Sequence, residues 1–168
     1  MVPTTLVSVE EYLNTDYSPD CDYVDGVLED RNVGQQKHAK VQTRIVVFLS
    51  QLFQALGALV VVEQRIKVSA TRYRVPDVCV VLGADPEEAV ITTPPFLCVE
   101  VLSPDDRMVR MNEKVKDYLA MGVRYVWVID PYVGTAWTHT SGGSFEVTDG
   151  VLRTKNPDIE MPLSEVMP

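Results

Sequence analysis

Two short apolar segments, VPDVCVVL at residues 75–82 and FLCVEVL at residues 96–102, each enclose one carboxylate. Both segments are short, rich in β-branched residues and bounded by Pro or Gly, a pattern that is typical of buried strands. Burying an unpaired carboxylate costs several kcal/mol, so Asp77 and Glu100 point to a compensating partner. A divalent cation is the simplest candidate, because hard cations take oxygen ligands.

Length and composition indicate one compact domain over residues 1–168. The chain has 168 residues, 46% of them hydrophobic, which is enough for a sizeable core. No apolar run approaches the roughly 20 residues of a membrane-spanning helix, and residues 1–11 do not have the pattern of a secretory signal. Of the three cysteines, two lie in apolar segments, so we expect reduced thiols and a cytoplasmic location.

The charge distribution is uneven along the chain. The formal net charge is −9, which argues against nucleic-acid binding, but residues 32–82 hold seven basic residues against two acidic ones. This local basic zone is compatible either with a nucleic-acid partner or with ordinary surface charge, because charge patterns bear only weakly on partners.

Helical periodicity predicts two main helices. A second, shorter signal is a capping-box sequence that predicts a helix over residues 8–13. One main helix covers residues 105 or 106 to 121 and ends at Gly122. The other covers residues 35–56 and ends at Gly57, with an apolar stripe formed by Val41, Ile45, Leu49, Leu52 and Leu56.

Strands are predicted between and after these helices, at residues 59–69, 74–82, 96–102 and 123–129. An N-terminal hairpin is expected around Asp25-Gly26, and C-terminal hairpins are expected at three later turns that contain Gly. Helices on the two sides of a central sheet indicate an α/β or α+β fold.

The strand pattern places candidate site residues near one another. Side chains alternate across a strand, so Asp77 shares a face with Cys79, and Glu100 shares one with Cys98. If these faces align, both carboxylates can reach one ion. In the predicted helix that ends at Gly122, Lys114 lies beside the apolar stripe. It is about 12 Å along the helix axis, which places it approximately level with Glu100. The alternatives are a salt-bridged acid and a lysine that stays in solvent.

A histidine completes the candidate site. His38 and Gln42 lie on the apolar face of the long helix at its N-terminal end, so this end is expected to border a cleft. The alternative for His38 is a hydrogen-bonded core residue. Two carboxylates and a divalent ion, with a lysine that orients water or stabilises charge, would suit metal-assisted phosphodiester hydrolysis.

The order of these motifs resembles the PD-(D/E)xK restriction-endonuclease-like superfamily, and more closely its Uma-two family. The segments that carry the resemblance span nearly the whole chain. They are DYVDG at 22–26, GQQKH at 34–38, VPD at 75–77 with EVLSP at 100–104, and the helix at 114–122 leading to YVWVIDP at 125–131.

The resemblance implies a restriction-endonuclease-like core, with a central mixed sheet flanked by helices and extra β-hairpins at both ends. It implies that Asp77 and Glu100 bind Mg²⁺ or Mn²⁺, and that Lys114 replaces the superfamily's strand lysine, because Leu102 occupies that position. The long helix has no Glu, which many superfamily members use as a further ligand. Asp25 could supply a carboxylate instead, although it is more simply a turn residue.

These observations predict a metal-dependent endonuclease acting on DNA, with Arg72, Arg74 and Lys116 as phosphate contacts. A non-catalytic binding or assembly module is one alternative, supported by the net charge and the missing strand lysine. A small-molecule phosphodiesterase is another, because phosphate-backbone affinity normally needs many cations. We also expect a homodimer, because the C-terminal hairpins offer sheet edges that need covering.

Overall fold

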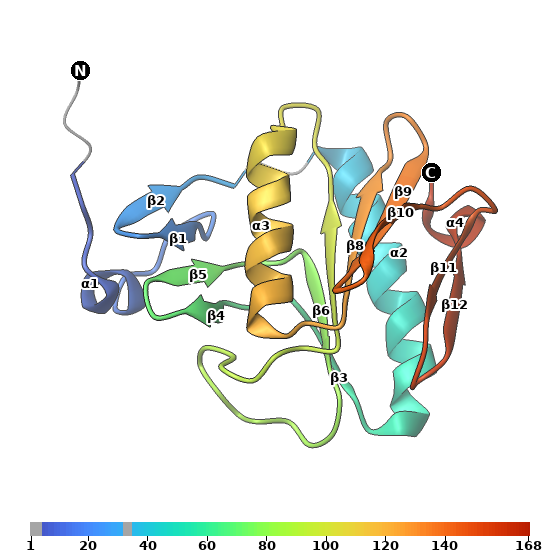
Figure 1. Ribbon diagram of the computed structural model, residues 1–168, viewed down its shortest axis with the longest axis horizontal. Helices are drawn as coiled ribbons and strands as arrows, with labels where there is room; N and C mark the ends of the chain where they lie inside the picture. Colours follow the sequence, from blue (N-terminus) through green and yellow to red (C-terminus); the bar gives the residue numbers. More distant parts are fainter. Residues whose placement is uncertain (1–4, 32–34) are drawn as a thin grey trace.

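The two carboxylate-bearing segments lie side by side in a six-stranded mixed sheet (Figure 1). The computed structural model describes residues 5–31 and 35–168. The strands of this sheet are β3 (Leu59–Val62), β6 (Val78–Val81), β7 (Leu97–Val101), β8 (Tyr125–Asp130), β9 (Thr135–Thr140) and β10 (Gly143–Glu146). Their order is β10-β9-β8-β7-β6-β3, in which β7 and β8 are parallel and all other neighbours are antiparallel.

Two long helices, α2 (Gln36–Phe53) and α3 (Met108–Met121), cover the two faces of this sheet (Figure 1). Successive residues of β6 alternate between two apolar clusters: Val78 and Val80 pack with α2, and Cys79 packs with α3. The predicted class, a mixed α/β fold with a central sheet flanked by helices, is therefore confirmed. The α2 residues in the first cluster are Val41, Ile45, Leu49 and Phe53.

A second, four-stranded sheet contains the predicted N-terminal hairpin. Its order is β2 (Val27–Glu29), β1 (Asp22–Val24), β5 (Arg72–Arg74) and β4 (Ile66–Ser69). Helix α1 (Val9–Leu13) has Ser8 as its N-cap, whose hydroxyl accepts a hydrogen bond from the backbone N–H of Glu11 at 3.0 Å. Tyr12 of this helix stacks on Tyr23 with ring centroids 5.0 Å apart, which attaches the helix to the hairpin.

Two of the three predicted C-terminal turns join hairpin strands, Val133-Gly134 between β8 and β9 and residues 141–143 between β9 and β10. The hairpin predicted at Asp149-Gly150 is wrong, because the strand after this turn pairs with the next strand in the chain and not with β10. β9 pairs with β10, and β11 (Val151–Thr154) pairs with β12 (Ile159–Pro162) in a two-stranded sheet. The short helix α4 (Leu163–Val166) was not predicted, and its Val166 is fully buried in the α2-side cluster. A single turn of 3-10 helix, η1 (Gln54–Leu56), follows α2 and leads to Gly57, which ends the helical segment as predicted.

The predicted strand over residues 59–69 is wrong, because it is two strands in two different sheets. β3 pairs with β6 in the central sheet, whereas β4 pairs with β5 in the four-stranded sheet. Between them Glu63 has a φ of 50°, a left-handed conformation that ends the extended segment. The predicted strand over residues 74–82 is likewise interrupted between β5 and β6, because Pro76 cannot donate a ladder hydrogen bond.

The predicted helix boundaries and apolar stripe also need correction. Leu52 and Leu56 are 42% and 56% exposed, whereas Phe53 is fully buried, because the buried face of α2 continues at intervals of four residues after Leu49. α3 begins at Met108, later than predicted, because the carboxylate of Asp106 accepts a hydrogen bond from the backbone N–H of Ser103 in a turn before the helix.

Two further sequence expectations concern the cysteines and membrane segments. Cys21, Cys79 and Cys98 are all buried free thiols, and Cys79 lies directly opposite Cys98 in the β6–β7 register. None of the helices in the described part of the chain has the length and hydrophobicity needed to cross a bilayer.

Candidate active site

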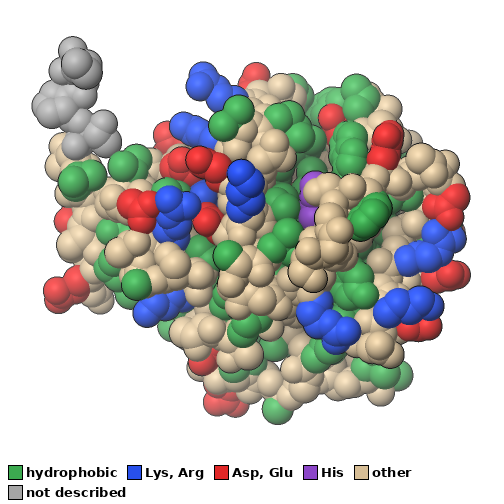
Figure 2. Space-filling model, viewed as in Figure 1, with side chains coloured by type: hydrophobic (Ala, Val, Ile, Leu, Met, Phe, Trp, Pro, Cys, Tyr) green, Lys and Arg blue, Asp and Glu red, His purple; other side chains and the backbone are tan. Residues whose placement is uncertain are grey.

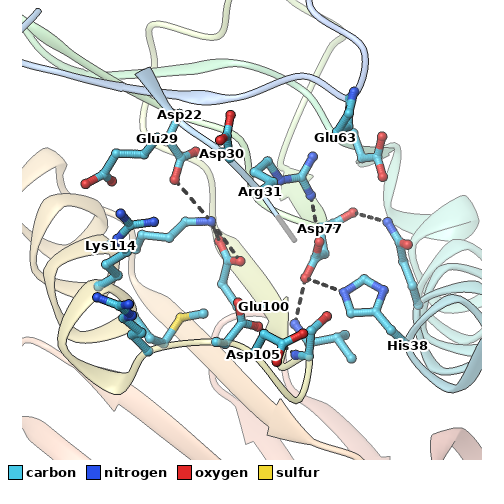
Figure 3. A pocket seen from close by; sticks show the side chains of 18 of the residues that line it. Asp22, Glu29, Asp30, Arg31, His38, Glu63, Asp77, Glu100, Asp105 and Lys114 are labelled. Carbon is cyan, nitrogen blue, oxygen red and sulfur yellow. Dashed lines mark hydrogen bonds and ion pairs between the residues drawn. The ribbon is translucent and has the colours of Figure 1, made fainter. Parts of the chain in front are cut away.

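A cleft of about 610 Å³ opens where the first turns of α2 and α3 meet the C-terminal end of β7 and the segment after β2 (Figure 3). Eight of its lining residues are acidic, four are Lys or Arg, and one is histidine. The cleft is therefore dominated by negative charge. The acidic residues are Asp22, Glu29, Asp30, Glu63, Asp77, Glu100, Asp105 and Asp106.

Both predicted carboxylates face this cleft. In the antiparallel register Val78 lies opposite Val99 and Cys79 lies opposite Cys98, so the two faces align as expected. Asp77 immediately precedes β6 instead of lying within it, and its Oδ2 accepts a hydrogen bond of 2.7 Å from the backbone N–H of Val101. This bond ties the start of β6 to the end of β7 and fixes the Asp77 carboxylate beside the strand that carries Glu100.

Three side chains hold Asp77 in place. Arg31 Nη2 donates to Oδ1 at 2.7 Å, and His38 Nε2 lies 3.3 Å from Oδ2. Gln42 donates to the backbone carbonyl of Asp77 at 2.9 Å. Burial alone would raise the pKa of Asp77, but the hydrogen bond with His38 and the charge of Arg31 lower it below its ordinary value. Asp77 is therefore a buried carboxylate that stays ionised.

Glu100 has a different environment. Lys114 Nζ lies 2.9 Å from its Oε1 and donates to its Oε2 at 3.0 Å, and the Tyr118 hydroxyl donates to Oε1 at 2.7 Å. Burial, only partly offset by the charge of Lys114, raises the pKa of Glu100 to about 7. Two neighbouring carboxylates thus have opposite pKa shifts, a pattern that is common at catalytic sites.

Lys114 lies on α3, on the side that the sequence predicted, and its side chain reaches the sheet (Figure 3). Its Nζ is also 3.5 Å from Oδ2 of Asp22, so one ammonium bridges two carboxylates from different sheets. Burial lowers the pKa of Lys114, but the charges of Asp22 and Glu100 outweigh that effect and raise it. Lys114 therefore remains protonated in the cleft.

Sequence reasoning missed three residues of this site. Asp22 on β1 and Arg31 after β2 come from the N-terminal hairpin, which was interpreted only as a turn motif. Tyr118 on α3 was not among the predicted site residues, yet its hydroxyl donates a hydrogen bond to Glu100. The sequence did contain a signal for Asp22, because this acidic residue stands between two apolar residues, Cys21 and Tyr23. Both of these neighbours are buried in the structure.

Asp25, predicted to line the cleft, does not lie among its lining residues. It occupies the hairpin turn with a φ of 50°, and its carboxylate accepts hydrogen bonds from Thr71 at 2.6 Å and from Arg72 Nη2 at 2.6 Å. Its short side chain is directed to β5 by the turn, so this carboxylate pairs with an arginine of the four-stranded sheet. His38 and Gln42, by contrast, do line the cleft.

The three predicted phosphate contacts lie outside the cleft. Arg74 is fully buried, and its guanidinium contacts Asp22, Glu29 and Asp117 at 2.7–3.2 Å, so it is a structural cation and not a surface one. Arg72 pairs with Asp25 at 2.6 Å and with Asp117 at 3.1 Å. Lys116 is exposed on α3.

The donor set can be compared with the needs of a divalent cation. Among residues 5–31 and 35–168, no three His, Cys, Asp or Glu side chains are arranged to hold a metal by themselves. Asp77 and Glu100 each accept three contacts of the roughly four that a carboxylate can accept, which leaves capacity for one more partner each. Mg²⁺ is commonly held by one or two carboxylates plus water and substrate phosphate, so this set fits it.

Comparison with known proteins gives a family and a structural relative. The model of the Uma2 family, described as "Putative restriction endonuclease", matches residues 9–165. A solved structure described as a "putative nuclease belonging to DUF820", from Anabaena variabilis ATCC 29413, is 18% identical and has a TM-score of 0.81. The match covers 95% of this chain and 97% of that one, which shows a shared fold. No curated protein matches the chain.

Proposed function

The chain belongs to the Uma2 family, as its motifs predicted, and we propose that its cleft is the active site of a metal-dependent endonuclease that hydrolyses phosphodiester bonds of DNA. The observation that carries the proposal is the convergence of Asp77, Glu100 and Lys114. These residues come from a loop, a strand and a helix, yet all three line one cleft, and Lys114 Nζ lies 2.9 Å from Glu100.

In this proposal Asp77 and Glu100 hold Mg²⁺ or Mn²⁺. The ion, when bound, would polarise a phosphoryl oxygen and lower the pKa of a nearby water. The cleft's acidic lining supports the choice of a cation, because six further acidic residues line it beside Asp77 and Glu100, against four Lys or Arg residues. The same lining disfavours a polyanionic substrate unless cations are present.

The other residues of the site have positioning roles. Lys114 would orient the attacking water or stabilise negative charge on the phosphate, and Asp22 fixes its ammonium on the cleft side of the sheet. Tyr118 fixes the rotamer of Glu100 through its 2.7 Å hydrogen bond. Arg31 and His38 do the same for Asp77 and keep its carboxylate ionised.

The family and the fold support a nucleic-acid substrate, and the proposal extends to assembly and location. We propose a homodimer, because β3 and β10 are both edge strands of the central sheet and unpaired edges are commonly covered. Sedimentation of the purified protein would test this directly.

A cytoplasmic location is proposed because all three cysteines are free thiols.

A cleavage assay with matched variants tests the proposed activity. Supercoiled plasmid and linear duplex would be incubated with wild-type protein, with Asp77→Asn and with Glu100→Gln, in Mg²⁺, in Mn²⁺ and in EDTA. Glu113→Gln is the control, because Glu113 is an exposed carboxylate on α3 that does not line the cleft. We expect metal-dependent cleavage that falls by about 100-fold or more in both site variants and is unchanged in the control.

Other outcomes would identify the alternatives. Equal cleavage by wild type and both site variants would contradict the proposal. Absence of metal-dependent cleavage of any nucleic acid would favour a non-catalytic binding or assembly module. Metal-dependent hydrolysis of small phosphodiesters without cleavage of DNA would favour a phosphodiesterase.

A further inference from the structure

Two arginines at the start of α3 line the cleft without a carboxylate partner. Within the described residues, neither the Arg107 side chain nor the Arg110 side chain takes part in a hydrogen bond, an ion pair or a cation–π contact, and both residues are exposed. The other two Lys or Arg residues of the cleft are paired, Arg31 with Asp77 at 2.7 Å and Lys114 with Glu100 at 2.9 Å. The cleft thus contains two cations that compensate its own carboxylates and two that do not.

Among the described residues, these two arginine side chains form no ion pair, although carboxylates line the same cleft. Eight acidic residues line the same cleft. A guanidinium has five N–H donors in a planar fork that suits carboxylate and phosphate groups equally well. Since Arg107 and Arg110 bind none of the carboxylates around them, their donors remain available to an anion from outside the protein.

The spacing of these residues along α3 suggests which anion. Arg110 precedes Lys114 by four residues on the same side of α3, and Arg107, the N-cap residue of this helix, precedes Lys114 by seven. All three residues line the cleft. At 1.5 Å per residue, Arg110 lies about 6 Å and Arg107 about 10 Å from Lys114 along the helix axis. Successive phosphates of one DNA strand lie farther apart than the rise of about 3.4 Å along the duplex axis, because the strand winds around that axis, so intervals of about 6 and 10 Å suit neighbouring phosphates of one strand.

We infer that Arg107 and Arg110 bind phosphates of a DNA strand that neighbour the phosphate positioned at Lys114. This inference rests on the proposed function, because it takes Lys114 as the position of the reacting phosphate. Three cations in a row over about 10 Å fit a polynucleotide better than a mononucleotide, which has too few phosphate positions to reach all of them. α3 would then provide both the catalytic lysine and the backbone contacts.

The proposed phosphate contacts of Arg107 and Arg110 take the place of those that the sequence predicted for Arg72 and Arg74. Arg72 and Arg74 are occupied by Asp25, Asp22, Glu29 and Asp117 and so have structural partners inside the protein. Figure 2 shows Lys and Arg side chains beside Asp and Glu side chains over the face on which α3 lies, so the surface there is mixed in charge. On such a surface unpaired arginines, and not net charge, determine where a phosphate backbone can bind.

The experiment measures DNA binding without hydrolysis. Fluorescence anisotropy of a labelled duplex would be recorded in Ca²⁺, which supplies a divalent cation to the acidic cleft, at salt concentrations from about 50 to about 200 mM, for wild type and for Arg107→Gln/Arg110→Gln. Lys116→Gln is the control, because Lys116 is an exposed cation on the same helix outside the cleft. We expect the slope of log affinity against log salt concentration to become shallower by about 1.8 in the double variant, because each lost phosphate contact removes about 0.9 from the slope. The slope of the control should equal that of wild type.

Three outcomes would overturn the inference. One is an affinity and salt slope of the double variant that equal those of wild type. A second is an equal loss in Lys116→Gln, which would show a general charge effect. The third is absence of duplex binding by wild type at low salt. As a further arm, a single-stranded tetranucleotide should compete better than a mononucleotide, and equal competition would also contradict the contact with several phosphates.

Failure of this inference differs from failure of the proposed function. If the arginine variant loses binding while Asp77→Asn and Glu100→Gln cleave DNA like wild type, the arginine contacts stand and the catalytic assignment falls. If the arginine variant binds like wild type while the carboxylate variants lose cleavage, the catalytic assignment stands and the arginine contacts fall.

Discussion

Lys114 Nζ lies 2.9 Å from Oε1 of Glu100, although one residue belongs to α3 and the other to β7. Leu102, two residues after Glu100, is only 5% exposed and packs in the apolar cluster with Met111 and Val115. A lysine at position 102 would have to bury its charge among those side chains, which is costly. The helix therefore provides the cation that the strand position cannot provide.

Removal of the Lys114 charge is expected to abolish most of the cleavage activity, whereas removal of the charge of the nearby Lys116 is expected to leave the activity unchanged. Lys114→Met should lower the rate of metal-dependent DNA cleavage by about 100-fold, because charge on the phosphate then lacks its stabilising ammonium. Lys116→Met, an exposed change on the same helix, should cleave at the wild-type rate. Single-turnover rates at saturating protein measure the difference. A Lys114→Met protein as active as Lys116→Met would contradict the assigned role.

The raised pKa of Glu100 predicts how stability depends on pH in the metal-free protein. Its pKa is about 7 in the folded state against an ordinary value of 4.5. The folded state therefore holds a proton that the unfolded state has released between these values, so Glu100 makes stability fall as pH rises from about 4.5 to about 7. Glu100→Gln should remove this contribution.

Urea unfolding in EDTA at several pH values between about 4.5 and about 8 would measure this effect. The free energy of unfolding should fall less steeply with pH in Glu100→Gln than in wild type. Parallel curves for the two proteins would show that Glu100 has an ordinary pKa.

Arg74 should be far more important for stability than Arg72. Arg74 is fully buried and contacts three carboxylates, so Arg74→Met leaves buried negative charges without a partner, at a cost of about 3–5 kcal/mol. The Arg72 side chain is 34% exposed, so Arg72→Met should cost about 1 kcal/mol or less. Chemical denaturation of the two variants measures the contrast, and equal losses would contradict it.

The observed orientation of α2 can be tested with two adjacent residues. Phe53 is fully buried in the core, whereas Leu52 is 42% exposed. Phe53→Ala should lower the free energy of unfolding by about 3–5 kcal/mol, and Leu52→Ala by about 0.5 kcal/mol. The reverse order would show that the stripe predicted from the sequence is the buried one.

Most of the fold was predictable because its elements carry strong local signals. The strand around Glu100, the end of the helix at Gly122 and the hairpin turn at Asp25 appear as expected, whereas the predicted strand around Asp77 is divided between β5 and β6. The split of residues 59–69 was not predictable, because an apolar run does not reveal which sheet each half joins. That division depends on a single left-handed residue, Glu63, whose side chain gives no signal for it.

The site residues that strand and helix periodicity determines could be predicted from the sequence. Those that reach the site through pairing between distant segments could not. Asp77, Glu100 and Lys114 follow from strand alternation and helix spacing, and the structure brings them into one cleft. Asp22 and Arg31 reach the cleft only because the N-terminal hairpin pairs with β5, a contact between segments about 50 residues apart in the chain. No local pattern encodes that pairing.

The proposed catalysis depends on Asp77 and Glu100 binding a divalent cation together in the cleft. Isothermal titration of Mn²⁺ into wild type and into Asp77→Asn/Glu100→Gln, each alone and with a duplex oligonucleotide, tests it most directly. We expect wild type to bind the ion, more tightly when DNA is present, and the double variant to lose this binding in both conditions. Equal binding by the two proteins, or no binding by wild type even with DNA, would contradict it.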